Sequence, residues 1–116
     1  MASESGCLFC SVLRGDIPAE TVVDNEHALA IRDLNPQAPT HLLVLPRGHH
    51  SDIASLARAD PDAAVAVLLT AREAAEHDGH GDAYRLVFNN GAEVGQSVFH
   101  CHGHVLAGRS FGWPPG

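Results

Sequence analysis

The chain has 116 residues and a mass of 12.2 kDa, which predicts a single compact domain over residues 1–116. Hydrophobic residues make up 45% of the sequence and charged residues 18%, a balance that excludes a disordered chain. Fourteen acidic residues against seven basic ones give a formal net charge of −7, with nine histidines counted as neutral, which argues against nucleic acid or an anionic membrane as a partner.

The pattern of apolar residues and turn formers predicts short strands joined by hairpin-length connections, with one long helix in the middle of the chain. Asp60-Pro61 marks the start of that helix, because an N-cap carboxylate precedes a proline at the first helical position. These elements indicate an α+β domain with an antiparallel sheet. In order, they are a helical turn at 7–13, strands at 21–23, 27–31 and 41–45, a short helix at 53–59, the long helix from 61 to about 76, and strands at 84–88 and 97–106.

The sequence carries no sign of export or membrane insertion. Residues 1–6 lack a cationic segment followed by an apolar run, and no stretch reaches the roughly 20 apolar residues that span a bilayer. The three cysteines are an odd number, and two of them form Cys7-x-x-Cys10, a spacing that indicates metal or redox chemistry in an intracellular chain. We therefore expect a cytoplasmic protein.

Three histidines alternate with small residues in the run His100-Cys101-His102-Gly103-His104. In a strand these imidazoles project from one face, roughly 6.5–7 Å apart, while Cys101 and Gly103 face the other side. A neutral imidazole can attack phosphorus directly, and its neighbours can donate protons to phosphate oxygens. The same row also fits a tri-histidine zinc hydrolase.

Motifs along nearly the whole chain resemble the histidine triad (HIT) superfamily, and several are similar to its Hint branch of nucleoside phosphoramidases. The resemblance implies a HIT-like fold, with an antiparallel sheet of about five strands and one long and one short helix. It also implies a homodimer that continues the sheet across a twofold axis. The segments that carry it are His100-x-His102-x-His104-Val105-Leu106, Gly95-Gln96-Ser97-Val98-Phe99, Trp113-Pro114-Pro115-Gly116, Ile17-Pro18-Ala19, residues 33–41 and residues 45–49.

The resemblance implies a hydrolase of purine nucleoside 5′-phosphoramidates or aminoacyl-adenylates. His102 matches the nucleophile that forms a covalent nucleotidyl intermediate, from which water releases AMP or GMP. His104 and His41 match its catalytic partners, and Ser97 matches a donor to the phosphate and the leaving group. No magnesium is required, because imidazoles and backbone amides supply the positive field. The nucleotide-binding positions implied are Asp33 for the ribose hydroxyls and Asn89, Gln96, Ser97, His102 and His104 around the phosphate.

Cys7 and Cys10, together with His49 or His50 and His100, supply the four ligands of a closed tetrahedral zinc site. Some HIT proteins carry zinc on a similar set that includes the first triad histidine. The resemblance therefore implies a structural zinc bound by Cys7, Cys10, His49 and His100, which leaves His102 free to attack.

Other functions stay open from the sequence alone. A dinucleoside polyphosphate hydrolase shares the triad, and a nucleotide-binding or scaffolding module with little turnover fits the unusual Cys101 and Gly103. We expect Cys101 to be a small buried residue, and Gly103 to mark a close helix approach or a bulge. Three apolar residues of the long helix fit either the core or a dimer contact: Val65, Leu68 and Leu69.

Overall fold

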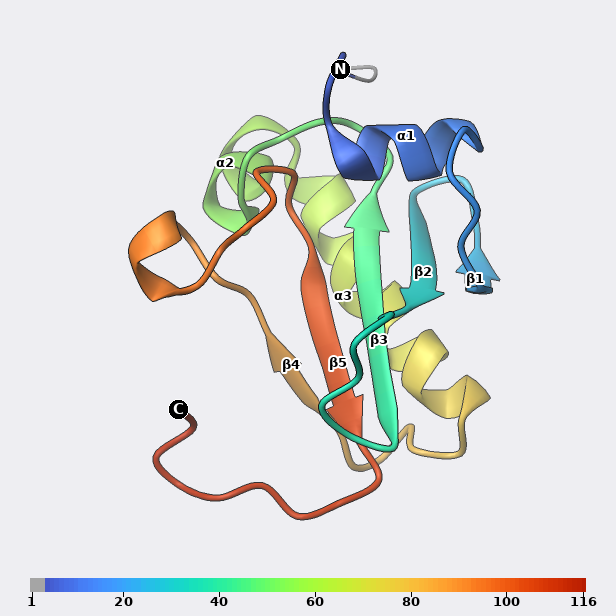
Figure 1. Ribbon diagram of the computed structural model, residues 1–116, viewed down its shortest axis with the longest axis vertical. Coiled ribbons are helices and arrows are strands. Elements are labelled where there is room, and N and C mark those ends of the chain that lie inside the picture. Colours follow the sequence, from blue (N-terminus) through green and yellow to red (C-terminus); the bar gives the residue numbers. More distant parts are fainter. Residues whose placement is uncertain (1–3) are drawn as a thin grey trace.

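Five antiparallel strands form one sheet in the order β1-β2-β3-β5-β4, with helices on both faces (Figure 1). The structure is a computed structural model and describes residues 4–116. It confirms the α+β class and the five-stranded sheet. The elements are α1 (Leu8–Arg14), β1 (Thr21–Asp24), β2 (Ala28–Arg32), β3 (Thr40–Pro46), α2 (Ile53–Ala59), α3 (Pro61–His77), β4 (Arg85–Val87), a 3₁₀ turn (Ala92–Val94) and β5 (Gly103–Ala107).

The structure has one helix more than the two that the resemblance implied, because the helical turn expected at residues 7–13 is a complete helix, α1. The Cys7 thiol caps its first turn by accepting from the backbone N–H of Cys10, and Gly15 ends it in the left-handed conformation. The α3 helix begins at Pro61 as predicted, with the Asp60 carboxylate accepting from the N–H of Ala63. Within residues 4–116, no helix is long and apolar enough to cross a membrane.

The strand predicted over 97–106 is wrong in its first half, because β5 begins only at Gly103. Pairing with β3 stops at Val44 opposite Gly103. Beyond that pair, β3 ends at Pro46, which has no N–H to extend the ladder. The backbone of Cys101 instead donates to the carbonyl oxygen of His50 at 2.6 Å. Residues 97–102 are therefore held by the loop after β3.

Each face of the sheet buries its own apolar cluster. On one face, α3 packs its buried alanines and Val67 over β2, β3 and β5, and Cys101 and Val105 belong to this cluster. On the other face, Phe9 of α1 covers Leu43 and Leu45 of β3 together with two residues of β2. Cys101 is buried, as expected, and it lies on the face opposite the triad imidazoles.

Gly103 marks a close approach, but the neighbours are not a helix and the strand has no bulge there. Its register with Val44 is regular. A Cβ at this position would lie 2.8 Å from the Phe88 ring and 3.0 Å from a methyl group of Leu86. The side chains in and just after β4 therefore fill the space that any larger residue at position 103 would need.

A partly buried ion pair joins the end of α3 to the sheet. Arg32, at the end of β2, donates two hydrogen bonds of 2.8 Å to the Asp78 carboxylate. The Thr40 hydroxyl, at the start of β3, donates to the same carboxylate at 2.8 Å. These bonds from Arg32 lower the pKa of Asp78 well below its usual range.

We expect Asp78→Asn to lower the free energy of unfolding at neutral pH by about 2 kcal/mol, since it weakens charge-assisted hydrogen bonds that are shielded from water. A carboxyl whose pKa is lowered by folding stabilises the protein above its unfolded pKa of about 4, and this contribution is lost as the pH falls further. The difference between the two proteins should therefore shrink below about pH 4 in urea titrations. Asp16→Asn, which removes the exposed pair with Arg14, should change stability by less than about 0.5 kcal/mol. A difference for Asp78→Asn that is constant with pH would contradict the assignment.

Candidate active site and metal site

The sheet places His104 and His41 on one face. In the β3–β5 ladder His41 is opposite Leu106, and Leu43 is opposite His104. Directly opposed residues of an antiparallel pair point to the same side, and so do alternate residues of one strand. The two imidazoles meet there, with His41 Nε2 3.0 Å from His104 Nδ1. The His102 ring lies next to that of His104, with ring centroids 5.2 Å apart.

Hydrogen bonding fixes which nitrogen of His102 is free. Its Nδ1 lies 2.7 Å from the carbonyl oxygen of His100, so Nδ1 carries the proton and donates. Nε2 then holds the lone pair. Burial lowers the pKa of His102, which keeps the ring neutral at neutral pH. The edge of the Phe9 ring packs against this imidazole at 4.9 Å between centroids. His102 is thus an oriented, neutral base or nucleophile.

The same reasoning makes His104 a donor. The backbone N–H of Gln37 donates to His41 Nδ1 at 3.0 Å, so the proton of a neutral His41 is on Nε2. That proton is donated to His104 Nδ1, which leaves His104 Nε2 protonated. Burial lowers the pKa of both rings and favours these neutral forms. The Nε2–H donor of His104 and the Nε2 lone pair of His102 could therefore contact an oxygen and the phosphorus of one phosphoryl group.

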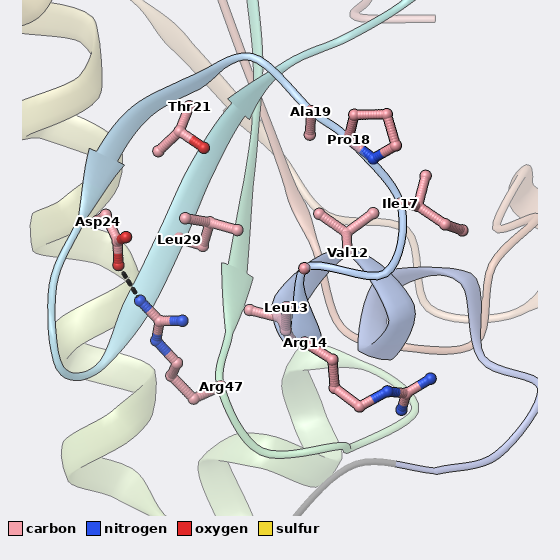
Figure 2. Close-up of a pocket in the computed structure, with 11 residues that line it drawn as sticks. Val12, Leu13, Arg14, Ile17, Pro18, Ala19, Thr21, Asp24, Leu29 and Arg47 are labelled. Carbon is pink, nitrogen blue, oxygen red and sulfur yellow. Dashed lines mark hydrogen bonds and ion pairs between the residues drawn. The ribbon is translucent and has the colours of Figure 1, made fainter.

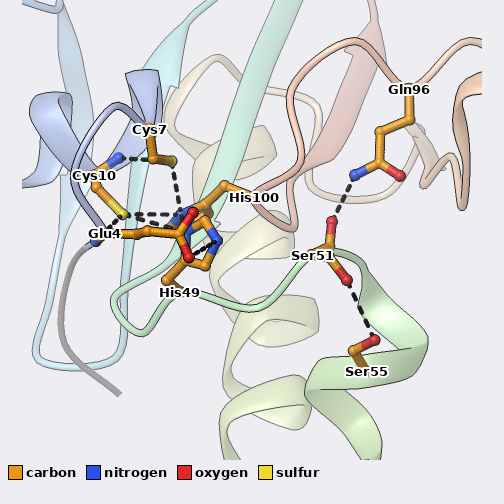
Figure 3. Close-up of polar contacts among 8 residues, drawn as sticks. All are labelled: Glu4, Cys7, Cys10, His49, Ser51, Ser55, Gln96 and His100. Atoms are coloured by element: carbon orange, nitrogen blue, oxygen red, sulfur yellow. Dashed lines mark hydrogen bonds and ion pairs between the residues drawn. The ribbon is translucent and has the colours of Figure 1, made fainter.

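The residues expected around a nucleotide differ in burial and in the hydrogen bonds that their side chains already make. Asp33 is half-buried, with one oxygen accepting from the N–H of Asn35 at 2.7 Å and the other 3.5 Å from His41 Nε2. Asn89 is half-buried and Ser97 is exposed. The buried amide of Gln96 instead donates to the carbonyl oxygen of Ser51 (Figure 3). It also donates to the carbonyl oxygen of Val98 and accepts from the N–H of Gly91.

A second cluster lies between α1 and the loop after β3 (Figure 3). One ligand atom from each of Cys7, Cys10, His49 and His100 comes within 4.8 Å of every other. His49 Nδ1 and His100 Nδ1 are 3.2 Å apart, and Cys10 Sγ is 3.3 Å from the first and 3.5 Å from the second. Cys7 Sγ lies 3.6 Å from His100 Nδ1. Tetrahedral zinc with Zn–S of about 2.3 Å and Zn–N of about 2.0 Å needs edges of roughly 3.3–3.8 Å, so the cluster fits zinc.

The surroundings of this cluster orient its ligands. His100 Nε2 donates to the carbonyl oxygen of Pro46 at 3.0 Å, which leaves Nδ1 free to coordinate. The Glu4 carboxylate lies 3.4 Å from His49 Nε2 and favours the same arrangement there. His49 rather than His50 enters the cluster. The structure thus separates His100, in the candidate metal cluster, from His102, whose ring lies beside that of His104.

Several contributors to the site have no signal in the sequence. Phe9 contacts His102 from α1, the Pro46 carbonyl orients His100, and the Gln37 N–H sets the tautomer of His41. Two of these are main-chain groups, which residue identity does not reveal.

A cavity of about 340 Å³ lies between α1 and the β1–β2 hairpin, and the Arg47–Asp24 ion pair borders it (Figure 2). None of the triad histidines lines this cavity.

An open antiparallel sheet with an oriented histidine row on one face defines a histidine triad protein. The family model of the HIT domain matches residues 14–111, and the chain belongs to this family. A HIT-like protein of Synechocystis, described as uncharacterized, is 46% identical over 109 residues, covering 94% of this chain and 96% of that protein. A 14 kDa zinc-binding protein of Zea mays is 39% identical over 116 residues, covering 97% and 90%.

Solved structures agree in fold over almost the whole chain. A HIT family hydrolase from Legionella pneumophila superposes with a TM-score of 0.90 at 43% identity and covers 96% of this chain and 100% of its own. One from Clostridium thermocellum gives a TM-score of 0.89 at 32% identity, with 95% and 96% covered. The chain therefore has the fold of HIT family hydrolases.

Proposed function

We propose that this protein hydrolyses purine nucleoside 5′-phosphoramidates or aminoacyl-adenylates through a nucleotidyl intermediate on His102. The observation that carries the proposal is the hydrogen bond from His102 Nδ1 to the His100 carbonyl, because it leaves a neutral Nε2 lone pair on the catalytic face. Similarity to HIT family hydrolases supports hydrolysis as the reaction class.

In the first step His102 Nε2 forms a bond to the α-phosphorus, and the bond from phosphorus to the leaving nitrogen or oxygen breaks. His104 Nε2–H donates to a phosphate oxygen as charge develops there. The Ser97 hydroxyl donates to the departing group. In the second step water attacks phosphorus and the N–P bond breaks with its electron pair returning to His102. The proton that this water loses replaces the one that the leaving group took through the Ser97 hydroxyl in the first step. The products are the amine or acid and a nucleoside monophosphate.

The nucleotide takes its remaining contacts from the loops around this face. We assign Asp33 to the ribose hydroxyls, since a carboxylate accepts from two of them, and Asn89 to the phosphate side. Gln96 supports the site indirectly, because its amide already fixes the loop that carries Ser97. We also propose that no magnesium is needed, because His104 and the backbone amides near Ser97 face the developing charge.

We propose a structural zinc in the cluster of Cys7, Cys10, His49 and His100. The donor set, its edge lengths and the oriented imidazoles support it, as does the zinc-binding relative from Zea mays. Bound zinc would close the cluster and tie α1 to the loop after β3. His100 would then hold its own carbonyl still, and that carbonyl orients the His102 ring.

Two alternatives from the sequence lose their main support. Cys101 and Gly103 pack toward the α3 side, so they give no reason for a triad with little turnover. Within residues 4–116 no metal-binding cluster contains all three triad histidines, which disfavours a tri-histidine zinc hydrolase.

Dinucleoside polyphosphate hydrolysis is the rival that experiment must separate. We expect kcat/KM for adenosine 5′-phosphoramidate to exceed that for diadenosine tri- or tetraphosphate by at least about a hundredfold, or roughly 2.7 kcal/mol in transition-state binding. Addition of EDTA to the assay buffer for minutes should leave the phosphoramidate rate unchanged. A reversed preference would replace the proposal with the polyphosphate reaction.

We propose a homodimer formed through α3 and β4. Val65, Leu68 and Leu69 of α3 are 54%, 47% and 66% exposed, so they lie on the surface and not in the core. β4 is an edge strand of the sheet, with only β5 as its neighbour. Sedimentation of the purified protein should give about twice the mass of one chain.

We also propose a cytoplasmic location, which is supported by the three cysteines, since they form no disulfide.

A further inference from the structure

The turn after β5 is docked onto the loop between β2 and β3 at two points. A Cβ on Gly108 would lie 2.8 Å from the Pro39 side chain, so the two segments are in close contact. The next residue, Arg109, donates from Nε and from one terminal nitrogen to the carbonyl oxygen of Gln37, at 3.2 Å and 3.1 Å. Its other terminal nitrogen donates to the carbonyl oxygen of Ser110 at 2.9 Å.

Gln37 is also the residue that sets the state of the triad partner. Its N–H donates to His41 Nδ1, and His41 donates in turn to His104. The Gln37 backbone thus accepts two hydrogen bonds from Arg109 through its carbonyl oxygen and donates one to His41 through its N–H. If Gln37 moves, His41 Nδ1 loses its donor, and only the contacts of Nε2 with His104 and Asp33 still favour the Nε2–H tautomer.

We propose that Arg109 is a positioning residue for the reaction, because it holds the Gln37 backbone where that backbone fixes the His41 tautomer and thereby makes His104 Nε2 a donor. This inference rests on the proposed function only for the role of His104. The arrangement of Arg109, Gln37 and His41 stands without it. The Gln37 side chain has no part in the chain of contacts, since its amide donates to the carbonyl oxygen of Asn35.

The protein offers a matched control in Arg85. Both arginines lie over the Phe111 ring, with their guanidinium carbons 5.1 Å (Arg85) and 4.1 Å (Arg109) from its centroid. Arg85 donates to the carbonyl oxygen of Gly112 and makes no contact with Gln37. Removing Arg85 therefore tests loss of charge and of ring contact in the same region without loosening the loop.

The test combines ¹⁵N NMR of the histidine rings with kinetics on Arg109→Met, Arg109→Lys and Arg85→Met. In the wild-type protein at neutral pH, His41 should be the Nε2–H tautomer. Arg109→Met should give a mixture of both tautomers and lower kcat for a phosphoramidate about fivefold with little change in KM, the effect of losing roughly one net hydrogen bond. Arg109→Lys should restore part of the Nε2–H tautomer of His41 and part of kcat.

Arg85→Met should keep the wild-type tautomer and rate. An unchanged His41 tautomer in Arg109→Met, or an equal effect from Arg85→Met, would overturn the inference. If the wild-type protein does not turn over phosphoramidates, the proposed function fails, but the tautomers of wild type and Arg109→Met still decide whether Arg109 positions His41. Thermal melting of each variant shows whether it is folded.

Discussion

Replacing His102 with alanine should lower kcat/KM for a nucleoside phosphoramidate on the order of 10⁴-fold, because the reaction loses the atom that bonds to phosphorus. The remaining rate would come from the donors around the phosphate, which still stabilise the developing charge. Single-turnover kinetics with adenosine 5′-phosphoramidate would measure the loss. Binding of AMP should change much less, since most of the proposed nucleotide contacts come from other residues.

His77→Ala is the matched control for His102→Ala, because His77 is an exposed histidine at the end of α3. It should leave the rate within about twofold of wild type, the range expected of an exposed substitution. A His102→Ala protein that is folded and retains more than about a tenth of the wild-type rate would show that another group attacks phosphorus.

Removing the proposed zinc should have the second-largest effect. Cys7→Ser keeps the size of the side chain but replaces a thiolate ligand with a hydroxyl, so we expect the zinc content to fall from near one per chain to near zero. Structural zinc sites contribute directly to folding, and the loss of even 3 kcal/mol should lower the melting temperature by about 10 °C or more. Turnover should also fall, since His100 orients His102.

Cys101→Ala is the matched control, because Cys101 is a buried cysteine outside the metal cluster. It should keep its zinc and lose no more than about 1 kcal/mol of stability, the cost of a small buried truncation. Metal analysis of protein purified without a histidine tag, before and after dialysis against a strong chelator, provides the measurement. Wild-type protein with no zinc, or Cys7→Ser with a full equivalent, would contradict the assignment.

The sequence predicts the elements well where local signals are strong and poorly where pairing decides. Asp60-Pro61 starts α3 as expected because a cap and a proline act locally. β5 begins six residues later than predicted, since its start depends on where pairing with the partner strand β3 ends. At Gly103 the sequence predicts a close helix approach or a bulge, whereas the close neighbours are Phe88 and Leu86, whose packing is non-local.

The candidate site follows the same division. Residue types at fixed spacing indicate two groups, the histidines of the triad and the set of candidate metal ligands. The structure brings His41 next to His104, and it gathers the four candidate ligands in a separate cluster. The tautomers, which decide what each imidazole can do, depend on backbone groups of His100, Gln37 and Pro46. Any residue except proline could supply the N–H of Gln37, and any residue could supply the two carbonyls, so no sequence pattern identifies them.

The most direct measurement is to trap the protein with a slowly hydrolysed phosphorothioate analogue of a nucleoside phosphoramidate and to map the adduct by mass spectrometry. We expect one nucleotidyl group per chain, attached to the peptide that contains His102 and absent from His102→Ala. A modified residue other than His102, or full turnover with direct attack of water shown by inversion at a chiral phosphorothioate, would contradict it.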